Sequence, residues 1–276
     1  MDTSILAKSF EKIGARVQVI PTFPQLSRRL LPFGNLPPAN GFSVDVRRDK
    51  MGEYFQIRTN PGIDFKAVEV RPEDRHLLLL AENDTGKHKF LCGHDERQWF
   101  VAAVPERVLG VKDVRSAKEA LKPNEVLSKQ HQTVAPVEGR RSRHNKVYQR
   151  QGEWFFMPMK DMPEPKPALI LKNEPVQRGG GKPHKCEYLY REGGETVYVS
   201  HIAPNGLTES EYKTLLRKDP SKQKENWRVM RRDAGVFVKG RITHTDHATL
   251  VLSGWHRILP NREGEAAAGR FNRFLD

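Results

Sequence analysis

The sequence predicts an α+β protein that is mainly β, with two antiparallel-sheet units that each carry a covering helix. Short apolar and aromatic runs recur with turn residues between them, few segments have helical spacing, and a polar stretch separates two groups of runs. A chain of 276 residues, 37% of them hydrophobic, is long enough for one large or two modest domains. We therefore expect four segments: an N-terminal helix with a proline-rich arm at 1–40, a sheet-rich domain at 41–122, a basic linker or loop at 123–145, and a second sheet-rich domain at 146–276.

The first forty residues predict a short helix and then an irregular arm. Apolar side chains at Ile5, Leu6, Phe10 and Ile13 line one face of a helix. The five prolines between residues 21 and 38 each remove a backbone donor and favour extended geometry at the preceding residue. We therefore predict an extended arm or loop there.

The first sheet-rich domain is predicted from β-branched and aromatic runs with turns every 8 to 12 residues or so. A helix over 111–121 should cover this sheet, because Val111, Val114, Ala117 and Leu121 form one stripe and Pro123 follows. The expected strands are 42–48, 53–59, 64–70, 75–81 and 98–104.

The second sheet-rich domain follows a stretch, 122–145, in which apolar residues are few and lack a period. It contains one helix with a clear start: Thr208 and Glu211 have the spacing of a capping box, and Tyr212, Leu215 and Leu216 should form its buried face. The expected strands are 167–173, 185–191, 195–202, 235–244 and 248–259.

The charge of the chain indicates a polyanionic partner. Lys and Arg number 47 against 34 Asp and Glu, which gives a net charge of +13 and a pI near 9.8. Such a surface concentrates phosphate-bearing partners and speeds their association. Nucleic acid is the expected partner, and RNA or a single strand is favoured over duplex DNA because no basic recognition helix is evident.

A basic run followed by aromatic residues is the first candidate nucleic-acid site. Guanidinium groups clamp phosphates, and exposed aromatic rings stack on bases. The alternative is a solvated loop beside a strand whose aromatic residues are core. The candidate contacts are Arg140, Arg141, Arg143, His144, Lys146, Arg150 and Trp154.

Two further basic segments suit phosphate contacts. Arg178 and Lys182 flank a glycine triplet, which lets backbone N–H groups approach a phosphate, although any flexible hairpin has the same composition. Arg231 and Arg232 end a stretch, 213–232, in which eight bases meet two acids.

Two Cys/His pairs are candidate metal ligands. Cys92 and His94, and His184 and Cys186, each have one residue between them, so on a strand each pair shares a face. Together they would supply a tetrahedral Cys2His2 zinc site. The alternative is two buried structural cysteines, each near a histidine.

A second histidine group suggests catalysis. Two imidazoles and a carboxylate, His244, His247 and Asp246, precede His256 and Arg257. If a turn at Ser253-Gly254 returned the chain, this group could bind Zn²⁺ or Mg²⁺, or act as acid and base on a phosphodiester. The alternative is a hydrogen-bonded turn that caps its strands.

The expected function is therefore nucleic-acid binding, with the enzyme question open. One alternative is a metal-dependent phosphodiesterase or nuclease that uses the C-terminal cluster, and another is a basic assembly protein that docks on an acidic partner or a ribonucleoprotein. With two cysteines, no signal-type N-terminus and no long apolar stretch, we expect a cytoplasmic protein without a membrane segment. The chain contains no Walker loop, dinucleotide fingerprint or nucleophile elbow.

Overall fold

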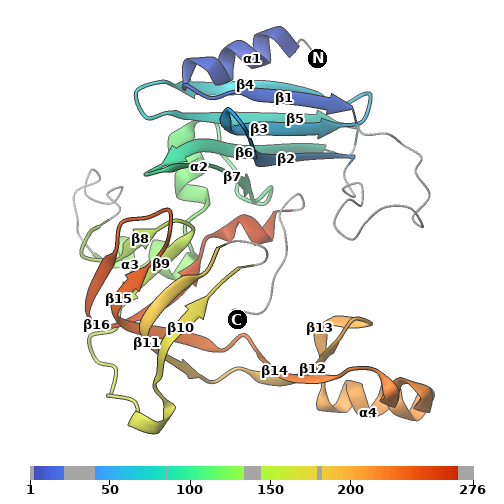
Figure 1. Cartoon of the computed structure of the whole chain (residues 1–276), viewed down its shortest axis with the longest axis vertical. Coiled ribbons are helices and arrows are strands. Elements are labelled where there is room, and N and C mark those ends of the chain that lie inside the picture. Colours follow the sequence, from blue (N-terminus) through green and yellow to red (C-terminus); the bar gives the residue numbers. More distant parts are fainter. Residues whose placement is uncertain (1–2, 22–40, 85, 134–143, 179–181, 267–276) are drawn as a thin grey trace. The chain divides into compact units, whose positions relative to one another are not determined.

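The computed structural model describes residues 3–21, 41–84, 86–133, 144–178 and 182–266. This part of the chain is mainly β, with four α-helices and several largely antiparallel sheets, which confirms the predicted α+β class (Figure 1). Unit 1 comprises residues 1–127 and 261–271, and unit 2 comprises residues 128–260 and 272–276.

Unit 1 contains a four-stranded and a three-stranded sheet. Its elements are α1 (Thr3–Lys12), β1 (Val17–Pro21), β2 (Phe42–Asp49), β3 (Gly52–Thr59), β4 (Asp64–Arg71), β5 (His76–Asn83), β6 (Gly86–Asp95), β7 (Gln98–Val104), α2 (Val114–Ala120) and η4 (Arg262–Glu265). The larger sheet is an antiparallel meander in the order β4-β5-β6-β7, and the smaller has the order β1-β3-β2 with β1 parallel to β3. Strand β1 was not predicted. It has only five residues and ends at Pro21, the first proline of the stretch for which an irregular arm was expected.

The leucine run of β5 divides the core of unit 1. Leu77 and Leu79 pack with Phe10 of α1 and Phe55 of β3, whereas Leu78 packs with α2 on the opposite face. A strand that is buried on both faces has a continuous apolar run, since neighbouring side chains point to opposite sides. The four-stranded sheet is thus the middle layer of this unit, and α2 is its predicted covering helix.

Helix α2 begins at Val114, three residues after the predicted start, because Asp113 caps it. The Asp113 carboxylate accepts the backbone N–H of Ser116, and the Ser116 hydroxyl accepts the backbone N–H of Asp113. The predicted linker differs from the structure, since Asn124–Gln132 forms a further helix, α3, in which Val126 is buried.

Unit 2 is built on a six-stranded antiparallel sheet. Its elements are β8 (Gln149–Gln151), β9 (Trp154–Pro158), η2 (Pro167–Leu169), β10 (Leu171–Val176), β11 (His184–Glu192), β12 (Glu195–Ser200), β13 (Ala203–Thr208), α4 (Glu209–Lys218), η3 (Pro220–Lys224), β14 (Arg228–Arg232), β15 (Gly235–Thr243) and β16 (Leu250–Pro260). The sheet has the order β10-β11-β15-β16-β9-β8. Its buried face includes Trp154, Phe156, Leu189, Val238 and Ile258.

Residues 195–232, which we call the arm, form an insertion between β11 and β15. The pair β12–β14 continues the pair β11–β15 in the same register, since Glu192 is opposite Gly235 and Glu195 is opposite Arg232. The ladder is interrupted at Gly193 and Gly194, which have φ of 70° and 77°. A Cβ at Gly194 would lie 2.8 Å from the Arg232 carbonyl oxygen, so the interruption requires glycine.

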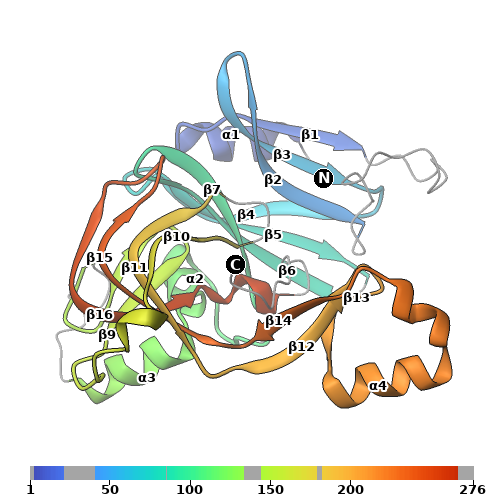
Figure 2. The same cartoon turned by 60° about the horizontal axis from the view of Figure 1, so that its bottom comes forward.

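Helix α4 confirms the predicted capping box. The hydroxyl of Thr208 accepts the backbone N–H of Glu211, and the Glu211 carboxylate accepts the backbone N–H of Thr208. Its apolar face is only half-buried, and the helix packs against β12 and β13 rather than covering the six-stranded sheet (Figure 2). Among the described residues, no helix has the length and apolar composition that a membrane span requires.

Candidate metal centre

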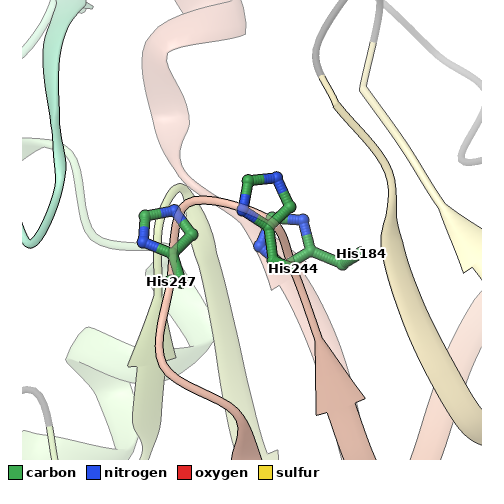
Figure 3. A group of neighbouring side chains, drawn as sticks. All are labelled: His184, His244 and His247. Carbon is green, nitrogen blue, oxygen red and sulfur yellow. The ribbon is translucent and has the colours of Figure 1, made fainter.

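Three histidines meet at one edge of the six-stranded sheet. Strand β11 begins at His184, and it pairs with the end of β15 through Lys185 and Thr243. His244 and His247 lie in the loop that follows β15, so antiparallel pairing brings this loop beside the start of β11 (Figure 3).

The three imidazoles offer nitrogens to a common space. One ligand atom of each ring lies within 4.8 Å of those of the other two, and no other group of three or more such ligands occurs in the described part of the chain. The ring centroid of His244 lies 4.2 Å from that of His184 and 4.7 Å from that of His247. The rings are within 25° of parallel, so binding one ion requires them to turn about χ2, a soft torsion.

Burial and mutual repulsion keep His184 and His244 neutral. His184 is 1% exposed and His247 is 4% exposed, whereas His244 is half-buried and gives the site a side open to solvent. Burial, followed by the charges of His244 and His247, lowers the pKa of His184 to about 3. Burial and His247 also lower the pKa of His244. Each of these two rings therefore has a lone pair at neutral pH.

The hydrogen bonding of the rings leaves room for an ion. Both ring nitrogens of His184 are buried, and neither has a hydrogen-bond partner among the described residues. A buried polar group without a partner costs about 1–3 kcal/mol, which a metal ligand bond would recover. At His244, Nδ1 accepts the backbone N–H of Asp246 at 3.1 Å, so an ion that binds through Nδ1 would replace this hydrogen bond.

Gly152 provides the space beside two of the rings. It lies in the turn between β8 and β9 with φ of 59°, and a Cβ there would lie 2.8 Å from Nε2 of His247 and 3.6 Å from Nε2 of His184. The turn is held against the histidine loop by Gln151, whose side-chain amide donates to the Ala248 carbonyl at 2.6 Å. Sequence reasoning missed Gly152, because its role depends on a contact between distant segments.

Of the predicted catalytic residues, only His244 and His247 belong to the histidine group. The Asp246 carboxylate is not part of the histidine group and accepts two hydrogen bonds from Nζ of Lys182, at 2.7 and 2.9 Å. Burial raises the pKa of Asp246, but the Lys182 bonds and charge outweigh it, and the net shift is downward. Lys182 is thereby placed at the rim of the centre.

The predicted turn at Ser253-Gly254 is wrong, because β16 runs through it from Leu250 to Pro260. His256 is opposite Val238, and its Nδ1 donates to the Gly254 carbonyl at 2.8 Å. Leu250 to His256 spans roughly 20 Å at about 3.3 Å per residue. His256, and Arg257 beside it on the strand, therefore do not belong to the histidine group.

The predicted Cys2His2 set is also divided. Cys92 lies in the core between the sheets of unit 1, and Cys186 lies in the core of the six-stranded sheet of unit 2. Burial raises the pKa of both thiols, that of Cys186 to about 12, which disfavours the thiolate that zinc binds. The ring of His94 packs on Trp99, with centroids 4.9 Å apart. His184 is the one member of this set in the histidine group.

The predicted nucleic-acid contacts have varied environments. Arg140, Arg141 and Arg143 lie outside the described residues. Trp154 is 1% exposed, and Phe155 and Phe156 are buried beside it, so the predicted stacking of bases on this strand is wrong. The remaining contacts are exposed at His144, Lys146, Lys182 and Arg231 and half-buried at Arg150, Arg178 and Arg232.

Protein-family models, curated proteins and solved structures all gave no match to this chain.

Proposed function

We propose that this protein binds one divalent metal ion, with Zn²⁺ as the expected metal, at His184, His244 and His247, and uses it to activate water. The observation that supports this most directly is the convergence of three imidazoles around His184, whose buried nitrogens lack hydrogen-bond partners. Three nitrogen ligands suit Zn²⁺, whereas Mg²⁺ favours oxygen ligands.

The ligand number supports a catalytic rather than a structural role. Structural zinc sites usually have four protein ligands, whereas catalytic sites have three and leave the fourth position to water. Bound Zn²⁺ lowers the pKa of that water to about 7, which supplies a nucleophile at neutral pH. The half-buried His244 lies on the side from which a substrate can approach.

Charge supports a phosphodiester, in nucleic acid, as the substrate class. The chain has a net charge of +13, and the exposed Lys182 lies at the rim of the centre. In the proposed reaction, the oxygen of the activated water bonds to phosphorus, the bond from phosphorus to the leaving oxygen breaks, and that oxygen takes up a proton. The products are a phosphomonoester and an alcohol.

The test combines metal content with hydrolysis. Protein is stripped with EDTA and reloaded with Zn²⁺ or Co²⁺, and the metal is measured by mass spectrometry and by the visible spectrum of Co²⁺. We expect one ion per chain and metal-dependent cleavage of an RNA or DNA oligonucleotide. His247→Ala should lose both, while oligonucleotide affinity persists, because a metal ligand acts on the reaction and not on the remote phosphates.

His131→Ala is the matched control, since His131 is an exposed histidine of the same unit that lies in α3, outside residues 195–232. It should retain metal and cleavage. Wild-type protein without bound metal, or equal cleavage by His247→Ala, would refute the centre. Binding of acidic polypeptide in preference to oligonucleotide would instead favour the assembly role.

A further inference from the structure

The arm carries a cluster of three aromatic rings at its surface. The rings of Tyr198 in β12 and Tyr212 in α4 are stacked, with centroids 4.1 Å apart and planes 6° from parallel. Trp227 meets Tyr212 edge-on at 4.9 Å. All three side chains are only half-buried, so part of each ring is accessible to solvent.

The face of the arm around these rings exposes one apolar and one basic side chain. Val229 is opposite Tyr198 in the β12–β14 ladder, so the two side chains share a face. Val229 is 65% exposed, which is high for a valine beside a tyrosine stack. Arg231, two residues further along β14, lies on the same face and is also exposed.

The acidic residues of the arm are all engaged within it. Glu195 pairs with Arg232, and Glu209 pairs with Lys213. Glu225 is close to Lys222 and His201. The carboxylates of Glu211 and Asp219 accept backbone N–H groups at the starts of α4 and η3. Among the described residues, none of these acids forms an ion pair with the remaining cations of the arm.

Those remaining cations are exposed. In the part of the chain that the structure describes, none of them forms an ion pair with a carboxylate, and Lys224 and Arg228 flank Trp227 in the sequence. They are Arg217, Lys218, Lys224, Arg228 and Arg231.

From this arrangement we infer that the arm is a docking surface for single-stranded nucleic acid, with bases against the Tyr198, Tyr212 and Val229 face and phosphates on the surrounding cations. Partly exposed aromatic rings and cations that form no ion pair are the two features that single-strand binding proteins combine. The inference rests on the proposal that the partner is nucleic acid, and it does not involve the metal centre.

The test measures the affinity of labelled oligo-U and oligo-dT, about a dozen nucleotides long, by fluorescence anisotropy in EDTA, which prevents cleavage. Replacing Lys218, Lys224 and Arg228 with Ala should weaken binding at least about tenfold and lower the salt dependence, by about 0.7 in the log–log slope for each lost phosphate contact. The charge-matched control replaces Lys166, Lys172 and Arg241 with Ala. These are exposed cations of unit 2 outside the arm, and the control should bind as the wild type does.

A second variant tests the rings. Tyr212→Leu should weaken oligonucleotide binding about tenfold, as expected for loss of one stacked base, and Tyr212→Phe should restore it. Circular dichroism checks that α4 is retained. Binding of polyglutamate should be unaffected by Tyr212→Leu, because that polymer has no bases.

The outcomes separate this inference from the proposed function. Salt-dependent binding by wild type that neither arm variant changes would refute the arm surface and leave nucleic-acid binding intact. No oligonucleotide binding by wild type at low salt would refute both the arm surface and the proposal that the partner is nucleic acid. Loss of affinity in the charge variant alone, with Tyr212→Leu unaltered, would refute the stacking surface.

Discussion

The segments Cys92-Gly93-His94 on β6 and His184-Lys185-Cys186 on β11 contain the same cysteine and histidine pair in reverse order. Their histidines lie in different environments. In both, the cysteine is buried in a sheet core. His94 packs on Trp99 and lies close enough to Arg75 for that charge, together with burial, to lower its pKa. His184 instead meets two more histidines. A pair of ligands on one strand thus becomes a candidate metal site only when the neighbouring strand brings others.

The sharpest test of this comparison removes one histidine from each segment. His184→Ala should lower metal affinity by more than about 100-fold, because loss of a ligand exceeds the roughly 10–100-fold cost of changing a residue that only supports a ligand. His94→Ala should leave the metal content unchanged. Isothermal titration of stripped protein with Zn²⁺ measures both affinities, and equal affinities would remove the distinction between the two segments.

Acid should destabilise the metal-free protein through His184. Its pKa is about 3 in the folded chain against an ordinary value of 6.5, so between these values the unfolded chain holds a proton that the folded chain does not. The contribution of His184 to the free energy of unfolding is complete above pH 6.5 and is lost as the pH falls toward 3, at about 1.4 kcal/mol per pH unit.

Urea unfolding in EDTA at a series of pH values measures this slope. His184→Leu, which removes the titrating group, should flatten it by about one proton. The same comparison with His94→Leu should change the slope less, since His94 is only half-buried whereas His184 is fully buried. Parallel curves for wild type and His184→Leu would contradict the expectation.

Gly152→Ala should have the smallest effect. The positive φ costs about 1 kcal/mol of stability or more for a residue with a Cβ, and that Cβ would crowd Nε2 of His247. We expect about a tenfold loss of Zn²⁺ affinity. Gly62→Ala in unit 1 is the matched control, because Gly62 has φ of 88° and open space around it. It should lose similar stability and no metal affinity.

The sequence determined the local features of this protein. Strand content, the Thr208 capping box, the α2 stripe and the excess of basic residues follow from neighbours a few positions apart, so patterns in the sequence predict them. The sequence also identified His184, His244 and His247 as chemically interesting, although it assigned them to two separate sites.

The tertiary structure alone decided which of these residues meet. His184 reaches His244 because β11 pairs with β15 through Lys185 and Thr243, across the insertion of the whole arm. Likewise, Trp154 is core because its strand pairs with β16, which no local pattern distinguishes from an exposed aromatic strand. Pairing between strands far apart in sequence depends on the packing of the complete sheet, and a pattern of a few residues does not contain that information.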